Sequence, residues 1–227
     1  YNKLKDNHIN NNITLLPNCV NINTFAKNKK YNVRDKLNLD KDTFVCLVSA
    51  RIDRQKNQLL LLEVLNMIKV DIKIHILFVG NITDSNYYEE MNQYIKQQAL
   101  ERFVSIITNI QPESEELVNI YLNSDALVLP STHEPFGIVV LEAWASSLPV
   151  IVSSSAGICN YIQNKENALI FENNCINSLK KTLLLLINDN TLHHTLINNA
   201  NKSVLSFDSN KIHSQLYSLY SNLIYQN

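Results

Sequence analysis

Short apolar runs that alternate with stretches of helical spacing are the feature that most constrains how this chain can fold. The runs are FVCLVSA (44–50), KIHILFVG (73–80), RFVSIIT (102–108), DALVLP (125–130), PVIVSS (149–154) and NALIFE (167–172). They are continuous and rich in β-branched residues, as strands buried on both faces are. Helical stretches follow the first four runs, at 57–69, 87–100, 114–124 and 137–147. This alternation predicts an α/β fold with a doubly wound parallel sheet, from about Thr43 to Glu172.

The two ends of the chain differ from this alternating middle. Residues 1–28 are rich in Asn and Lys, and their one extended patch, ITLLPNCV (13–20), indicates a strand that ends in a turn, or a linker. Residues 30–39 have apolar positions at roughly helical spacing and predict a short helix. Beyond residue 173 the spacing is helical throughout, so we expect C-terminal helices packed against the α/β domain.

Composition excludes several classes of function. The formal net charge of −1 at pH 7 gives no bulk attraction for nucleic acid or anionic membranes, so any anion site must be local. The four cysteines are scattered without metal-site spacing, which favours a reduced, cytoplasmic compartment. No apolar run approaches the ~20 residues that span a bilayer, and the polar first residues show no secretory signal. The first residue is Tyr1 and not Met, from which we expect a fragment.

A helix start with an acid on each side follows the fourth run, in STHEPFGIVVLEAW (131–144). Ligands of parallel sheets bind at the carboxyl ends of the strands, and a helix start offers free N–H groups and a partial positive charge. A glycine there lets a ligand approach the backbone closely. The amides of Phe136, Gly137 and Ile138 are therefore candidates for contacts with phosphate or sugar oxygens.

The two acids are Glu134, in the loop, and Glu142, about five residues into the helix and roughly 7 Å further along at 1.5 Å per residue. Carboxylates accept hydrogen bonds from vicinal hydroxyls, so the pair could hold a sugar at one end and a ribose at the other. Alternatively, Glu134 is a helix-start acid favoured by the dipole and Glu142 faces solvent. The neighbours of Glu142 are apolar on nearly all sides, which favours a buried glutamate with a partner. Trp144 is expected in the core.

A basic patch, SARIDRQKNQ (49–58), follows the first run. Arg51 closes the strand, and Lys56 lies near the start of the next helix. Two fixed cations beside a helix start suit a diphosphate and would replace a metal as charge neutraliser. Asp53 and Arg54 are expected to point to solvent. The alternative is a solvated basic turn with no ligand.

Three stretches of the chain, in this order, resemble the C-terminal, donor-binding half of retaining glycosyltransferases of the GT-B fold, family 4 (glycosyltransferase group 1). They are SARIDRQKNQLLLLEVL, THEPFGIVVLEAWASSLPVIVSSSAG and NALIFE. The resemblance covers roughly residues 18–190, and its specific part is the Glu-x7-Glu pair with PFG between. It implies that Arg51 and Lys56 hold the donor diphosphate and stabilise it as leaving group. It also implies that no metal serves this step.

The resemblance assigns the remaining donor contacts residue by residue. Glu134 would hydrogen-bond hydroxyls of the donor sugar, and the amides of Phe136, Gly137 and Ile138 would contact that sugar or the phosphate. Glu142 would bind the ribose hydroxyls. The stretch Thr108, Asn109 and Ile110 would border the base, and Gly80, the last residue of the second run, joins this donor-binding set. Ala50, Asn57 and Ala156 stand where the family usually has glycine.

The resemblance also implies how the chain is divided. Residues 1–28 would be a linker strand and remnant of a missing N-terminal domain. Residues 29–227 would be a Rossmann-like nucleotide-sugar-binding domain with C-terminal helices, one half of a GT-B fold. The missing half would hold the acceptor, a lipid-linked sugar, a glycan or another molecule, and the final helix (210–224) would lean back toward it. We expect a cytoplasmic protein that reaches a membrane surface only through the missing part.

The resemblance thus implies a donor domain that binds UDP- or GDP-hexose and transfers the hexose with retention, by front-face displacement, without cofactor or metal. We expect no nucleic-acid partners. Alone it is expected to be inactive. The alternatives are a non-catalytic nucleotide-sugar-binding or scaffolding module, or another GT-B-like enzyme such as an epimerase or phosphorylase. DKD (40–42) matches a D-x-D metal motif but precedes the first run, so we interpret it as a solvated turn. His133 is interpreted as a loop residue, and His193 and His194 as no metal site.

Overall fold

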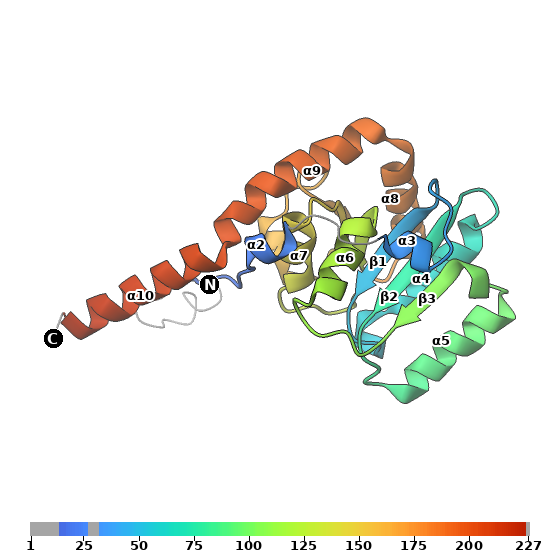
Figure 1. The fold of residues 1–227 in the computed structure, drawn as a ribbon, viewed down its shortest axis with the longest axis horizontal. Helices are drawn as coiled ribbons and strands as arrows, with labels where there is room; N and C mark the ends of the chain where they lie inside the picture. The colour runs from blue at the N-terminus through green and yellow to red at the C-terminus, as the bar shows by residue number, and fades with distance from the viewer. Residues whose placement is uncertain (1–13, 27–31, 226–227) are drawn as a thin grey trace.

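The computed structural model describes residues 14–26 and 32–225, and one parallel sheet forms the centre of this part (Figure 1). The strand order is β3-β2-β1-β4-β5-β6. The strands are β1 (Phe44–Ser49), β2 (Ile74–Val79), β3 (Val104–Ile107), β4 (Ala126–Leu129), β5 (Val150–Ser153) and β6 (Leu169–Phe171). Each lies inside the run predicted for it, and all pairings are parallel. The predicted Rossmann-like, doubly wound α/β fold is confirmed.

Both faces of the sheet are buried, which explains why the apolar runs are continuous. In β1, Val45 and Leu47 belong to one hydrophobic cluster, whereas Cys46 and Val48 belong to the other. Successive side chains of a strand point to opposite faces, so each strand contributes to both cores.

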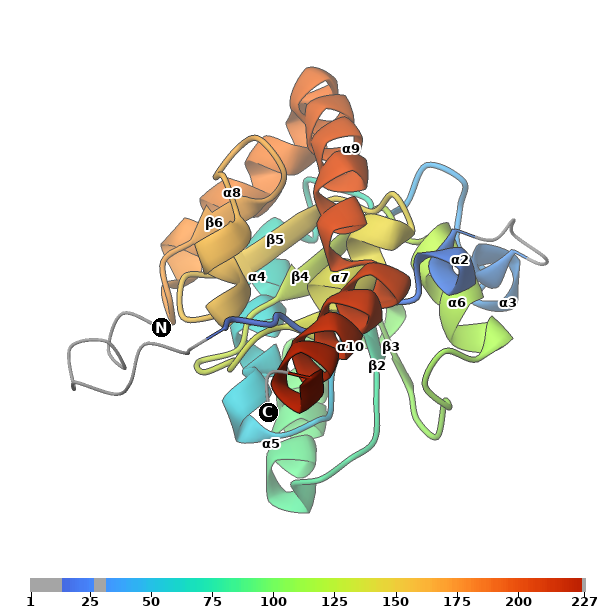
Figure 2. The same cartoon turned by 90° about the vertical axis from the view of Figure 1, so that its left-hand side faces the viewer.

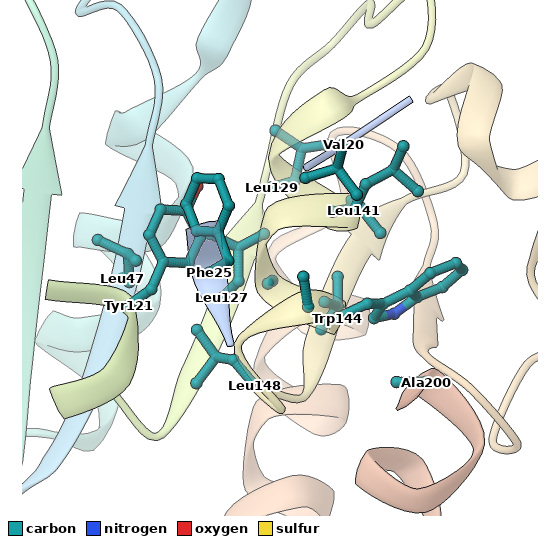
Figure 3. Close-up of a cluster of buried hydrophobic side chains, with 14 of the residues drawn as sticks. Val20, Phe25, Leu47, Tyr121, Leu127, Leu129, Leu141, Trp144, Leu148 and Ala200 are labelled. Atoms are coloured by element: carbon teal, nitrogen blue, oxygen red, sulfur yellow. The ribbon is translucent and has the colours of Figure 1, made fainter. Parts of the chain in front are cut away.

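Helices cover the two faces of the sheet. One face carries α4 (Gln58–Ile68), α5 (Ser85–Gln97) and α8 (Ile176–Asn188); the other carries α6 (Glu115–Asn123), α7 (Ile138–Ala145) and the short α2 (Ile22–Phe25) and α3 (Val33–Lys36). The helices predicted between the runs are confirmed. In the described part of residues 30–39, the predicted short helix is the single turn α3. Trp144 is fully buried on the α7 side and lies toward Ala200 (Figure 3), so its prediction as a core residue is confirmed.

The C-terminal helices are α9 (Asn190–Val204) and α10 (Ser209–Tyr225), joined by the 3-10 turn η4 (Leu205–Phe207). Helix α10 runs away from the sheet in Figure 1 and toward the viewer in Figure 2. The Val20 amide donates to the Phe207 carbonyl at 3.0 Å, and the Ser209 amide donates to the Val20 carbonyl at 3.0 Å. These two hydrogen bonds therefore anchor the extended N-terminal segment at the turn between α9 and α10.

Of the two alternatives for residues 13–20, a strand that ends in a turn or a linker, the strand is wrong in the described part. Residues 14–19 lie in no strand, and Val20 makes only an isolated bridge with Asp208. Pro17 has no amide hydrogen to offer a neighbouring strand, and the segment lies against a helix turn instead of a sheet edge. Among the described helices, none is both long and apolar enough to cross a bilayer.

Candidate active site

A pocket of about 310 Å³ opens where β1 and β4 end. Its lining contains six of the residues that the sequence proposes as a site, namely Arg51, Lys56, Glu134, Phe136, Gly137 and Ile138. They come from two loops that are far apart in the chain, and the parallel sheet brings the loops to one edge because the strands before them end there. Ser49, at the end of β1, and Asn18, from the N-terminal segment, also line the pocket and were not predicted.

The turn between β1 and α4 is shaped by Asp53. Its carboxylate accepts from the Lys56 amide at 3.2 Å, which caps the 3-10 turn Arg54–Lys56. It also lies 3.2 Å from the Arg51 guanidinium, and its side chain is only 13% exposed. The prediction that Asp53 points to solvent is wrong, because capping this turn draws the carboxylate inward. Arg54 is exposed as predicted and pairs with Glu90.

Lys56 and Glu134 form an ion pair inside the pocket. Lys56 Nζ lies 2.6 Å from Glu134 Oε2, and the two side chains are 13% and 14% exposed. Arg51 is more open, with 57% of its side chain exposed at the same mouth. The pocket therefore holds a largely buried ion pair, Lys56 with Glu134, and a more accessible cation, Arg51, whose guanidinium also lies 3.2 Å from Asp53.

The loop after β4 is held in place by the segment after β5. The Gly157 amide donates to the Glu134 carbonyl at 2.8 Å, and the Ile158 amide donates to the Phe136 carbonyl at 2.8 Å. The side chain of Phe136 packs against Tyr161 and Phe207, with ring centroids 6.1 and 6.3 Å away. Backbone and aromatic contacts together hold this loop in place beside the pocket.

Helix α7 begins at the pocket. Gly137 is its N-cap, with φ +106°, a conformation that side-chain-bearing residues rarely adopt. The first amides of a helix have no acceptor within the helix. With Gly137 and Ile138 in the pocket lining, the positive end of the α7 dipole lies at the pocket.

Glu142 lies further along α7, outside the set of residues that line the pocket. The Tyr121 hydroxyl donates to Glu142 Oε2 at 2.6 Å. Burial raises the pKa of Glu142, the Tyr121 hydrogen bond lowers it, and the charge of Glu113 raises it further. The carboxylate is thus largely buried with a partner, as its apolar neighbours indicate. The partner itself was missed, since a tyrosine within LVNIYLN gives no signal beyond a core residue.

The residues proposed to border the base are not among those that line the pocket. Thr108, Asn109 and Ile110 follow β3, and the Asn109 amide donates to Asn81 Oδ1 at 2.9 Å. Gly80 directly follows β2 with φ +150°, and a Cβ there would lie 2.1 Å from the Ala50 carbonyl oxygen. Close backbone packing between the ends of β1 and β2 therefore requires glycine at position 80, whatever part this residue has in donor binding.

The signals interpreted as non-functional have ordinary surroundings. Asp40 and Asp42 are exposed and lie 3.5 and 2.7 Å from Lys73, so this segment is a solvated turn as predicted. His133 is an exposed loop residue. Within residues 14–26 and 32–225, no group of three or more His, Cys, Asp or Glu side chains could hold a metal ion.

The sequence is similar to a known protein family and to individual known proteins. The family described as glycosyl transferases group 1 matches residues 29–203. An Escherichia coli protein named UDP-Gal:alpha-D-GlcNAc-diphosphoundecaprenol alpha-1,3-galactosyltransferase is 28% identical over 93% of this chain and 54% of its own length. The chain spans about half the length of the curated relatives that it matches.

Solved structures share the fold. Anabaena HepE, crystallised with UDP and glucose, superposes with a TM-score of 0.83 at 21% identity, over 92% of this chain and 56% of HepE. The C-terminal domain of LpcC, a group 1 glycosyl transferase of Francisella tularensis, superposes with a TM-score of 0.71 at 24% identity, over 82% of this chain and 97% of that domain. With its fold, its pocket and a family match that covers most of its length, the chain belongs to the group 1 glycosyltransferases.

Proposed function

We propose that this domain binds a nucleotide-diphosphate sugar, UDP- or GDP-hexose, and is the donor half of a retaining glycosyltransferase of family 4. The observation that carries the proposal is the meeting of Lys56 and Glu134 at 2.6 Å, in a pocket that Arg51 and the start of α7 also line. Two cations and a helix start suit a diphosphate, and a carboxylate suits sugar hydroxyls. One pocket therefore offers complementary groups for both parts of an activated sugar.

In this proposal each group has one task. Arg51, Lys56 and the α7 amides bind the diphosphate and stabilise the negative charge that it gains as the bond to the sugar breaks. Glu134 accepts hydrogen bonds from the sugar hydroxyls and orients the ring, while Glu142 accepts from the ribose. The acceptor hydroxyl attacks on the face that the diphosphate leaves, which gives retention. No metal is proposed for this step.

The acceptor is proposed to bind a second domain, to which residues 1–28 are the linker. Two features support this. The chain spans about half of its curated relatives. Helix α10 also carries exposed apolar side chains, Tyr217, Tyr220 and Ile224, beside a groove of about 710 Å³ that the N-terminal segment and α10 form. We propose that this surface faces the other half, and that the acceptor is a lipid-linked sugar, as in the name of the E. coli relative.

Calorimetric titration of the chain with UDP, GDP and ADP tests donor binding. We expect micromolar binding of UDP or GDP that a chelator does not change. Lys56→Ala should weaken it at least about tenfold, since a charge-assisted contact is worth roughly 1.5–3 kcal/mol. Arg54→Ala removes a cation from the same turn that faces Glu90 and not the pocket, so it should leave the affinity unchanged. Equal losses in both variants, or no binding at all, would contradict the proposal.

Transfer itself needs a separate test. An N-terminal, acceptor-binding domain would be placed before this chain in one polypeptide. The joined protein would then be supplied with a nucleotide-sugar donor and a lipid-linked acceptor. Retention would be read from the anomeric configuration of the product. Binding without transfer in the joined protein would favour a non-catalytic binding module instead.

A further inference from the structure

Tyr121 carries a buried hydroxyl whose position no packing requirement explains. The residue lies in the last turn of α6 and is 0% exposed. A phenylalanine would fill the same apolar space, and a buried hydroxyl costs free energy unless it has partners. The Tyr121 hydroxyl has two, Glu142 and Ser49.

The first partner is the carboxylate assigned to the ribose. The Tyr121 hydroxyl donates to Glu142 Oε2 at 2.6 Å, a short hydrogen bond between residues on two different helices. In the described part of the chain it is the one side-chain hydrogen bond recorded for Glu142. Because one carboxylate oxygen is fixed by the phenol, the rotation of the carboxylate is fixed as well, and the second oxygen remains as acceptor.

The tyrosine side chain is itself held at its ring and at its hydroxyl. Phe25 of α2 packs against it edge to face, with ring centroids 5.5 Å apart and the rings at 80° (Figure 3). Ser49 shares a side-chain hydrogen bond with the phenol and lines the pocket. A chain of contacts therefore runs from the pocket wall through Ser49 and Tyr121 to Glu142.

The hydrogen bond also affects the ionisation of the Glu142 carboxyl group. Burial disfavours the ionised carboxylate, and the negative charge of Glu113 disfavours it further. The Tyr121 bond opposes both, because a donor to a carboxylate stabilises its ionised form.

We infer that Tyr121 is a positioning residue that keeps Glu142 oriented to accept hydrogen bonds from the ribose hydroxyls of the donor nucleotide. The inference rests on the proposed function, since it needs a nucleotide in the pocket. It adds that discrimination between ribose and deoxyribose depends on a hydroxyl group on α6 that contacts no ligand.

The test compares two ligands that differ only in the ribose hydroxyls. UDP and 2′,3′-dideoxy-UDP are titrated against the chain, or the two guanosine analogues if GDP binds more tightly. The ratio of the two affinities isolates the hydroxyl contacts, because contributions of the diphosphate and the base cancel. We expect a ratio of about tenfold or more in the wild type, as for hydrogen bonds to a charged group. Tyr121→Phe should lower this ratio at least about threefold, because it weakens the contacts to the ribose hydroxyls and leaves the contacts to the diphosphate intact.

Two further variants separate positioning from general damage. Glu142→Gln should lower the ratio, and the double variant with Tyr121→Phe should lower it no further, because the tyrosine acts through the glutamate. Tyr87→Phe is the matched control: Tyr87 is 1% exposed, and its hydroxyl accepts from the Leu59 amide at 2.9 Å, away from Glu142. The affinity ratio of Tyr87→Phe should equal that of the wild type. Melting temperatures of all variants show whether any of them is generally destabilised.

The outcomes distinguish the two proposals. If neither UDP nor GDP binds, the proposed function is overturned and the inference with it. If one binds but the ratio is near one, or is the same in Tyr121→Phe as in the wild type, the inference alone is overturned. A further loss in the double variant would also overturn it, because Tyr121 would then act independently of Glu142.

Discussion

Lys56 and Glu134 neutralise each other across the pocket, with Nζ and Oε2 2.6 Å apart and both side chains mostly withdrawn from solvent. Because both side chains are mostly buried, little water is available to hydrogen-bond either group if the ion pair separates. A ligand that occupies the site must therefore supply both an anion for the lysine and hydroxyl donors for the carboxylate. A nucleotide sugar does both, whereas a free nucleotide diphosphate supplies only the anion and leaves Glu134 facing negative charge.

Glu134→Gln is accordingly expected to tighten binding of free UDP or GDP. The substitution removes a negative charge beside the diphosphate and releases Lys56. Charges about 4 Å apart repel by roughly 1 kcal/mol even in bulk water, and by more in a partly buried site, so we expect a gain of about fivefold or more. The same variant should bind the nucleotide sugar less well relative to the nucleotide, since a neutral amide is a weaker acceptor for hydroxyls. Calorimetry with both ligands measures the two effects.

Glu90→Gln controls for a change in net charge. Glu90 pairs with Arg54 on the exposed side of the same turn, at 2.6 Å. It should leave both affinities unchanged. Weaker binding of the free diphosphate in Glu134→Gln would show that the carboxylate does not compete for Lys56.

Gly80→Ala is expected to be among the most destabilising single substitutions in the chain. Its Cβ would meet the Ala50 carbonyl oxygen at 2.1 Å, and φ of +150° is strained for alanine. Overlap with backbone and strain act together, so we expect a loss of about 3 kcal/mol or more in the free energy of unfolding. Urea denaturation followed by circular dichroism gives the value.

Gly137→Ala provides the comparison. Its φ of +106° is also strained, but the nearest atom to an added Cβ is Leu129 Cδ2 at 3.3 Å, a side-chain atom that can shift. A cost of about 1–3 kcal/mol is expected from the strain alone. Equal losses at the two glycines would mean that the contact with Ala50 has no energetic weight.

The fold was predictable because the strands are buried on both faces. Continuous β-branched runs such as those that became β1 and β5 have no other common explanation when helical stretches separate them. The convergence of Lys56 and Glu134 followed from the same logic, since both residues come after strands that end at one edge of the sheet.

What could not be predicted depends on contacts between elements. The bond between Tyr121 and Glu142 joins two helices and leaves no periodic trace in either sequence. The inward turn of Asp53 follows from capping geometry in a three-residue turn, which the charge pattern of ARIDRQKN does not reveal. The strand expected near Pro17 fails because hydropathy alone does not specify a pairing partner.

Phe207→Leu is expected to weaken nucleotide binding although Phe207 lies outside the pocket lining. Its ring packs against Phe136 and Tyr161, with centroids 6.3 and 5.1 Å away. A smaller, differently shaped side chain loosens the support of the loop that carries Glu134, at a cost of about 1 kcal/mol in stability. We expect the dissociation constant for UDP or GDP to rise about two- to fivefold, roughly 0.4–1 kcal/mol.

Phe78→Leu is the matched control, because Phe78 is equally buried but belongs to the core on the other face of the sheet. It should lower the melting temperature without changing affinity at temperatures where both variants are folded. Equal changes in affinity would indicate a general effect of lost stability.

The dependence of ribose discrimination on pH follows from the state of Glu142. Burial, the largest influence, raises its pKa above the ordinary value of 4.5, so the folded chain protonates this carboxyl at a higher pH than the unfolded chain does. A protonated carboxyl is a weaker acceptor for hydroxyls. As the pH falls through the raised pKa, the ratio of UDP to dideoxy-UDP affinity should therefore decline, before an ordinary glutamate would protonate.

Tyr121→Phe should move this decline to higher pH, because the hydrogen bond that it removes favours the ionised carboxylate. Glu142→Gln should abolish it. Between the ordinary and the raised pKa the folded chain holds the extra proton, so the contribution of Glu142 to the free energy of unfolding falls as pH rises through that window. Titrations of both ligands across the acidic range measure the profile; because the phosphates of the two ligands titrate alike, their ionisation cancels in the ratio. A profile that is identical in the wild type and Glu142→Gln would place the titrating group elsewhere.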